Sequence, residues 1–419
     1  MTNHEQLKAY ARLIVRTGCA LRPGQEILID APVDAAHFVR MVVQEAWEAG
    51  AAAVDLQWTD DAVGRMHYLN APASAFEQVA PWKALRRNSA AERGAVILQL
   101  DGSDPDGMAG VDPARFTAMS RASFRDCRAF YDGMDQGRNV WCIAGVATPA
   151  WAKKVFPGLS EQDALERLWD AILATARADG PDPAKAWAEH DAAFRKRIER
   201  LNARQFDALR YTAANGTDFT VGLNRGHVWC GGAAKTVEGV AFFPNMPTEE
   251  IFTSPDCTRA DGVVHSAMPL NYNGGLIDDF WVEFREGKAV DCGAAKGLEL
   301  LRSILAVDEG ATRLGEVALV PHESPIARSG ILFYSTLYDE NAACHLALGK
   351  GFPECIEGGL EMDDAALEAH HVNNSATHVD FLIGTADLTI TGLHADGREE
   401  PVFLCGNWTG EFRRIPINK

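Results

Sequence analysis

The sequence is poor in positive charge. It contains 40 lysine and arginine residues but 58 aspartates and glutamates, so the formal net charge is −18 at pH 7. Proteins that bind nucleic acids need a basic surface to neutralise phosphates, so we expect no nucleic-acid partner. The chain also has no apolar run of the roughly 18 residues that a membrane-spanning helix requires, and we therefore expect no membrane span.

Disulfide, secretory and dinucleotide signals are missing as well. The nine cysteines are scattered, odd in number and contain no C-x-x-C pair, which argues against a disulfide framework or a zinc knuckle. The N-terminal segment lacks the uninterrupted apolar stretch of a secretory signal, so we expect a cytoplasmic protein. The loop after the first expected strand reads Ala31-Pro32-Val33 and not G-x-G-x-x-G, so we expect no dinucleotide site there.

The apolar periodicity predicts two domains with a boundary near residue 205. Domain 1–205 alternates helices and strands, which predicts an α/β fold with a mostly parallel sheet. Domain 206–419 shows short alternating strands and glycine turns, which predicts a β-rich α+β domain. The segments behind this prediction are helices at 5–18, 34–48, 160–204, 296–307, 340–349 and 363–371, and strands at 26–30, 52–58 and 95–102.

Six potential metal donors lie in the second domain. Four are carboxylates and two are imidazoles: Glu250, Glu316, Glu340, His345, His378 and Asp380. Two adjacent divalent ions need about this many donors, provided that a carboxylate bridges them, and such pairs hydrolyse amide and phosphoester bonds with an activated water. Mixed oxygen and imidazole donors suit zinc, cobalt or manganese.

Each donor taken alone also has a structural interpretation. In the expected strand 377–384, the period of two places His378 and Asp380 on one face, yet many edge strands carry alternating polar residues. Glu316 opens an apolar strand, where a carboxylate is costly unless it is paired or metal-bound, and it could equally be an exposed strand end. Glu250 sits in a proline-flanked loop where acidic residues are commonly solvated.

The last two donors fall in the expected helix 340–349. His345 is surrounded there by small apolar residues, so either a hydrogen bond or a metal would satisfy its ring. Glu340 lies five residues earlier and points away from His345 on a regular helix. It reaches the same ions only if the first helical turn is frayed.

With these segments in view, the chain resembles the aminopeptidase T family of metallopeptidases, which includes aminopeptidase S and PepS. The resemblance covers nearly the whole length and rests on several motifs in order: YARLIVRTGCALRPGQEILIDAP, EAWEAGAAAVDLQWTDD, NMPTEEIFTSP, RLGEVALV, FYSTLYDENAACHLALG and THVDFLIG. It implies a two-metal aminopeptidase acting on peptides, with an α/β domain, a C-terminal metal domain and a homodimer. It also implies that all six donors are metal ligands.

One position departs from the family. The family usually has a tyrosine seven residues after the histidine of the DENAACH motif, and this chain has Phe352 there. Phenylalanine carries no proton, so either the tyrosine is dispensable, or Tyr338 or Lys350 replaces it, or the chemistry is slow or altered.

Two other functions stay open at this point. Some relatives of this scaffold are mononuclear Fe(II) ring-cleaving dioxygenases, for which two histidines and Asp380 would suffice. They would not need Glu250, Glu316 and Glu340. A catalytically silent dimeric binding protein is the third hypothesis, and it is motivated only by Phe352.

Overall fold

The computed structural model describes residues 4–272 and 274–413, which form two compact units that interleave along the chain. Unit 1 comprises Met1–Ala188, Ala233–Thr248 and Ile331–Leu337, and unit 2 comprises Glu189–Gly232, Glu249–Gly330 and Tyr338–Lys419. The division of the chain into domains 1–205 and 206–419 stays a prediction. No helix in the described ranges is long and apolar enough to cross a membrane.

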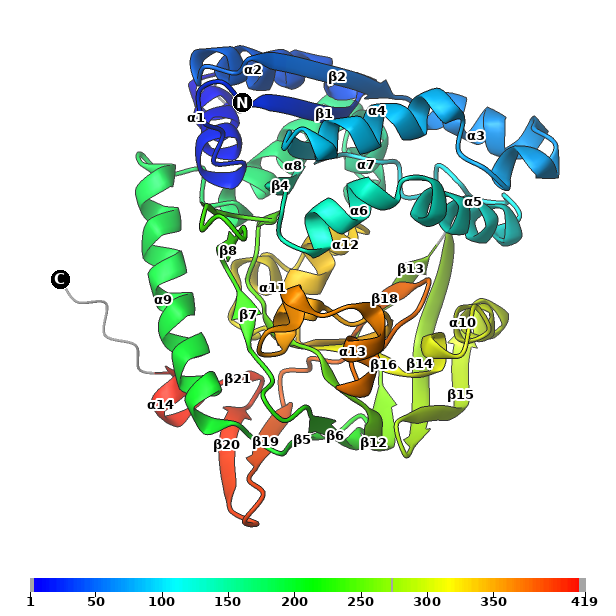
Figure 1. The fold of residues 1–419 in the computed structure, drawn as a ribbon, viewed down its shortest axis with the longest axis vertical. Helices are drawn as coiled ribbons and strands as arrows, with labels where there is room; N and C mark the ends of the chain where they lie inside the picture. The colour runs from blue at the N-terminus through cyan, green and yellow to red at the C-terminus, as the bar shows by residue number, and fades with distance from the viewer. Residues whose placement is uncertain (1–3, 273, 414–419) are drawn as a thin grey trace. The chain divides into compact units, whose positions relative to one another are not determined.

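Unit 1 is an α/β unit built on a parallel five-stranded sheet in the order β10-β4-β3-β1-β2 (Figure 1). Its strands are β1 Glu26–Pro32, β2 Ala53–Thr59, β3 Val96–Asp101, β4 Trp141–Gly145 and β10 Asn245–Met246, and a separate ribbon pairs β8 Ala234–Lys235 with β9 Ala241–Phe242. Its helices are α1 His4–Leu13, α2 Ala36–Glu48, α3 Asp61–Asn70, α4 Pro81–Glu92, α5 Pro113–Asp126, α6 Arg128–Asp135, α7 Pro149–Val155 and α8 Glu161–Thr175. The mostly parallel sheet expected from the sequence is confirmed.

Apolar contacts hold the helices of unit 1 in place. Leu28 of β1 and Ile97 of β3 belong to a buried cluster with Ala91 of α4 and Phe130 of α6. A second group stacks aromatic rings from α1, α2 and α8, with Tyr10 and Trp169 at 5.5 and 5.1 Å from the ring of Phe38. Buried aromatic pairs at these separations add about 0.5–1.5 kcal/mol each beyond their area.

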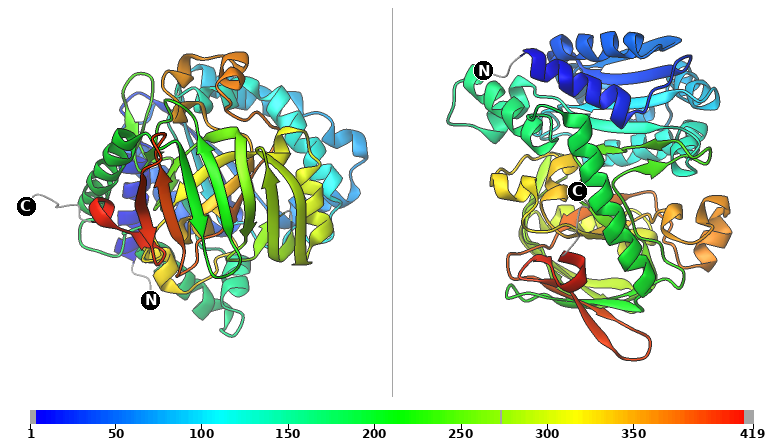
Figure 2. Two further views of the ribbon diagram at one scale, coloured as in Figure 1. Left: turned by 90° about the horizontal axis from the view of Figure 1, so that it is seen from below. Right: turned by 90° about the vertical axis from the view of Figure 1, so that its left-hand side faces the viewer.

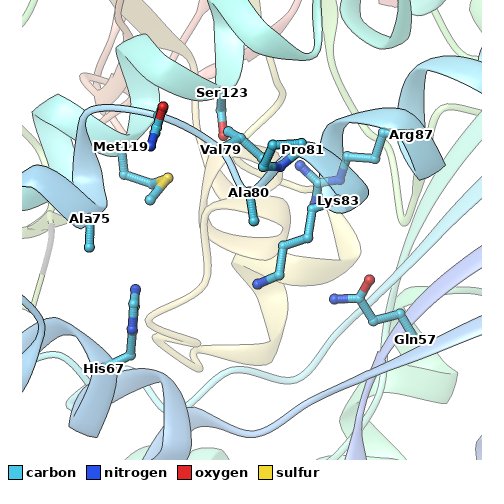
Figure 3. Close-up of a pocket in the computed structure, with 11 residues that line it drawn as sticks. Gln57, His67, Ala75, Val79, Ala80, Pro81, Lys83, Arg87, Met119 and Ser123 are labelled. Atoms are coloured by element: carbon cyan, nitrogen blue, oxygen red, sulfur yellow. The ribbon is translucent and has the colours of Figure 1, made fainter.

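Unit 1 also contains a pocket of about 540 Å³ (Figure 3). The side chains of His67, Lys83 and Gln57 point into it in the close-up, and Met119 adds an apolar wall. None of the six expected metal donors lines this pocket.

Unit 2 is β-rich and contains two antiparallel sheets, the larger of which is seen face-on in Figure 2. The five-stranded sheet runs β18 His378–Leu382, β17 His345–Gly349, β16 Leu314–Leu319, β11 Ile251–Thr253 and β7 Cys230–Gly231. The nine-stranded sheet runs β13 Leu270–Tyr272, β14 Gly275–Arg285, β12 Pro255–His265, β6 Asp218–Leu223, β5 Ala208–Thr212, β19 Thr389–Leu393, β20 Glu399–Leu404 and β21 Asn407–Trp408, with β15 Lys288–Lys296 paired to β14.

Few helices accompany these sheets. Within unit 2 lie α10 Leu298–Leu305, α11 Pro325–Ser329, α13 Asp364–Ala369 and α14 Gly410–Arg413, while α9 Pro183–Arg204 and α12 Thr336–Asp339 span the two units. The helices expected at 296–307 and 363–371 are therefore confirmed, with shorter bounds than expected.

The helix expected at 340–349 is wrong. A 3-10 turn at Glu340–Ala342 is followed by strand β17, His345–Gly349, whose five residues are all buried. The segment AACHLALG is rich in alanine and leucine, which favour helix. Pairing with β16 on one side and β18 on the other overrides that preference, because a strand covered on both faces can be apolar throughout.

Candidate metal centre

Four of the six expected donors lie on one face of the five-stranded sheet, because side chains alternate along its strands. The other face joins the apolar core of unit 2 through Leu314, Val317, Leu319, Leu346, Leu348, Val379 and Phe381. The residues that alternate with these apolar ones project from the opposite face of the sheet. They include Glu316 on β16, His345 on β17, and His378 and Asp380 on β18. The one-face prediction for His378 and Asp380 is thus confirmed.

The strand register brings these side chains together across the sheet. Ala347 is paired with Glu316 on one side and with Asp380 on the other, and Gly349 is paired with His378. Directly paired residues of antiparallel strands project to the same face, so the small residues of β17 leave room between the donors. Gly349 has φ +107°, and a Cβ there would lie 2.1 Å from the carbonyl oxygen of Thr377, so a larger residue does not fit.

Five of the six donors form two groups, and in each group the donor atoms lie within 4.8 Å of one another. The first contains Glu250, Glu316 and His345, with His345 Nε2 3.2 Å from Glu250 Oε2. The second contains Glu316, His378 and Asp380, with His378 Nε2 3.1 Å from Glu316 Oε2 and 3.2 Å from Asp380 Oδ1. Glu316 belongs to both groups.

Main-chain carbonyls orient both imidazoles. His345 Nδ1 lies 3.1 Å from the carbonyl oxygen of Ala343, and His378 Nδ1 lies 2.7 Å from that of Lys350. A ring that donates its Nδ1–H to a carbonyl turns Nε2 toward the carboxylates, which is the arrangement common around metal-binding histidines. No sequence signal points to these carbonyls, since any residue type supplies one.

Glu340 lies beside the two groups without belonging to either. Burial raises its pKa well above the ordinary glutamate value, and the charges of Glu250 and Asp380 raise it further. Glu340 stands on the 3-10 turn that leads into β17, where its Oε1 accepts from Asn341 Nδ2 at 3.4 Å. The prediction that Glu340 points away from His345 depended on a regular helix, which the structure does not have at this position.

Burial and neighbouring charges shift the pKa values of the groups in this cluster. Burial and the charges of Asp380 and Glu250 raise the pKa of Glu316, although the hydrogen bond with His378 opposes the shift. Burial would lower the pKa of His345, but the hydrogen bond and charge of Glu250 raise it to about 10. Four carboxylates held this close are costly without cations, because buried like charges repel in a low dielectric.

The donor set fits divalent cations. Asp380 Oδ1 is buried, and within residues 4–272 and 274–413 no hydrogen-bond donor meets it with good geometry. Carboxylate oxygens and histidine Nε2 atoms are donor types that divalent metal ions accept.

Phe352 lies directly against the second group. Its ring centroid is 4.9 Å from that of His378 and 5.5 Å from that of Phe252. Its backbone N–H donates to Ser254 Oγ at 2.8 Å, which holds the segment after β17 in place. The position where the family usually has tyrosine is therefore next to a candidate ligand.

An α/β unit together with a β-rich unit that carries two carboxylate–imidazole groups fits a metal-dependent enzyme. Comparison with known proteins agrees: the model of the thermophilic metalloprotease family M29 matches residues 3–408. The chain belongs to this family and is a peptide hydrolase, and the resemblance seen in the sequence is confirmed.

Relatives match nearly the full length of the chain. Aminopeptidase 2 of Geobacillus stearothermophilus is 43% identical and covers 97% of this chain and 98% of its own. The structure of wild-type AmpT from Thermus thermophilus superposes with a TM-score of 0.89 at 38% identity, covering 97% of this chain and 99% of its own. A 2,5-dihydroxypyridine dioxygenase from Pseudomonas putida reaches a TM-score of 0.51 at 12% identity over 99% of this chain and 100% of its own, which shows a shared fold alone.

Proposed function

We propose that this protein is a dinuclear metal-dependent aminopeptidase, with Glu250, Glu316, Glu340, His345, His378 and Asp380 as the ligands of two zinc, cobalt or manganese ions. The observation that carries the proposal is the membership of Glu316 in both donor groups. A mononuclear site would need only one of these groups. The names of the relatives, which are aminopeptidases, support removal of N-terminal residues from peptides.

The chemistry of such a site divides between the ions and the chain. When bound, the two ions would polarise the scissile carbonyl and activate a water for attack. Glu316 would hold them at a fixed separation, and the carbonyls of Ala343 and Lys350 would keep both imidazoles in the ligating tautomer. The buried carboxylate of Glu249, which is outside the proposed ligand set, would favour the protonated α-amine of a peptide over a blocked end.

We also propose a homodimer, from the family resemblance, and a cytoplasmic location, from the free-thiol usage of the nine cysteines. Light scattering at micromolar concentration tests the first: a single species at one chain mass would contradict it. Fractionation of cells that produce the untagged protein tests the second.

The test of the activity uses peptides with free and with N-acetylated ends. Protein loaded with zinc, cobalt or manganese is expected to release the first residue from free dipeptides and aminoacyl-anilides. The acetylated forms should be cut at least about 100-fold more slowly, since they lack the α-amine that the site recognises. Absence of cleavage of every free peptide at full metal occupancy would favour the silent binding protein instead.

The dioxygenase hypothesis has no observation in its favour. A mononuclear iron site would leave the buried carboxylate of Glu250 without a second cation. The likeness to the dioxygenase is one of fold, and the family membership is with peptide hydrolases.

Phe352→Tyr tests the altered position. We expect kcat on dipeptides to rise by about 10-fold or more, because a phenol beside His378 adds a hydrogen-bond and proton donor of the kind that contributes to general acid–base catalysis. The matched control is Phe252→Tyr, the neighbouring ring on β11, which should leave kcat unchanged. Equal kcat for wild type and Phe352→Tyr would show that this chain does not need the hydroxyl.

A further inference from the structure

Asn341 is a fully buried amide in the 3-10 turn that precedes β17, with an exposed fraction of 0%. It lies between two segments that are distant in the sequence and that each carry a candidate ligand. One is the segment of Glu249 and Glu250 at the start of β11, and the other is its own turn, which begins at Glu340.

Its side-chain oxygen holds the first segment. The backbone N–H of Glu249 donates to Asn341 Oδ1 at 2.6 Å. Glu249 is itself buried, and a buried N–H without an acceptor costs about 1–3 kcal/mol. This bond fixes the main chain one residue before Glu250, and thereby the point from which that carboxylate reaches the first donor group.

Its side-chain nitrogen faces the second segment. Asn341 Nδ2 donates to Glu340 Oε1 at 3.4 Å, a long contact. The main-chain oxygen of Asn341 accepts from Ser324 Oγ at 3.0 Å, so the turn is anchored from a third side. Since Oδ1 faces an N–H and Nδ2 faces a carboxylate, the reverse amide orientation would lose both bonds.

We propose that Asn341 is a positioning residue that fixes the segments carrying Glu250 and Glu340, an inference that rests on the dinuclear site proposed above. Only a short side chain with both an acceptor and a donor performs this task. Aspartate keeps the acceptor but turns the donor into a second carboxylate against Glu340, while alanine removes both.

The test measures metal binding directly, without turnover. Apoprotein is titrated with Co²⁺ alone, and the number of ions, their dissociation constants and the visible absorption bands of bound Co²⁺ are recorded. Asn341→Ala and Asn341→Asp should each weaken at least one of the two ions by about 10–100-fold and change the intensity of its bands. Tighter binding to Asn341→Asp would overturn the proposal, since it would mean that added negative charge matters more than orientation.

Asn139→Ala is the matched control. Asn139 is also a buried asparagine, and its Nδ2 donates to the carbonyl oxygens of Ala91 and Ala95 in unit 1 at 3.1 and 3.0 Å. The Asn139→Ala substitution should lower the melting temperature and leave the affinity for Co²⁺ at the wild-type value. Asn341 variants that melt earlier but bind Co²⁺ as the wild type does would contradict the positioning role.

The two proposals fail differently. If the wild-type protein itself binds fewer than two Co²⁺ ions, the dinuclear site is wrong. If the wild type binds two and the Asn341 variants bind both with unchanged constants and spectra, only the role of Asn341 is wrong.

Discussion

Replacing Glu316 by glutamine is expected to lower kcat/KM for dipeptide hydrolysis by about a thousandfold or more and to reduce the bound metal from two ions toward one. Glutamine keeps the size of the side chain and one acceptor oxygen, but it removes the charge that both donor groups share. Loss of a buried electrostatic element of this kind typically costs about 10²–10³ in rate, and loss of an ion removes its contribution as well. The measurements are steady-state kinetics and metal analysis of the dialysed protein.

Glu283→Gln provides the control for this substitution. Glu283 lies on β14 of the same unit and forms an ion pair with Arg285 at 2.7 Å. It belongs to neither donor group. Surface pairs of this kind are worth less than about 1 kcal/mol, so activity and metal content should stay at wild-type values. A Glu316→Gln protein that retains two ions and near-normal kcat/KM would rule out a carboxylate bridge.

Removal of the metal is expected to have the second large effect, a loss of both activity and thermal stability. Dialysis against a chelator should abolish peptide hydrolysis, and zinc, cobalt or manganese should restore it. The melting temperature of the apoprotein should fall by about 10 °C, because ligand at a thousand times its dissociation constant stabilises the native state by about 4 kcal/mol. Without cations, the carboxylates of the two donor groups repel one another in a buried site.

The double variant His345→Ala/His378→Ala serves as the control, since its melting temperature should respond little to added metal. Protons and cations compete for the Nε2 atoms, so metal affinity should fall as the pH is lowered. Burial lowers the pKa of His345, but the hydrogen bond and charge of Glu250 raise it to about 10. Protons therefore compete for this imidazole over a wider pH range. Full activity after exhaustive chelation, with no metal detected, would contradict a metal-dependent mechanism.

The local periodicity of the sequence predicts the first unit well. The helix expected at 34–48 is α2 at Ala36–Glu48, and the strand expected at 52–58 is β2 at Ala53–Thr59. Both elements owe their form to interactions between residues a few positions apart, namely the apolar spacing and the left-handed Gly50 that follows α2. Such signals are complete within a short window of sequence.

The segment from Glu340 to Gly349 shows where this kind of reasoning stops. Short apolar runs fit a buried helix and a buried strand equally well, and the composition of AACHLALG favours helix. The choice depends on β16 and β18, which lie more than twenty residues away in either direction. With the strand in place, His345 points to the same face as Glu316, which a helix would not have ensured.

From the sequence alone, the chemical nature of the centre follows: four carboxylates, two imidazoles, their order in the family motifs, and the common face of His378 and Asp380, since a strand of period two is a local property. The tertiary structure adds that Glu316 belongs to both candidate groups, that main-chain carbonyls meet both imidazoles, and that Asn341 hydrogen-bonds to the segments of Glu249 and Glu340. These facts depend on strand register and on hydrogen bonds between segments far apart in the chain. Neither is encoded in any single stretch of residues, because both arise only when the sheet assembles.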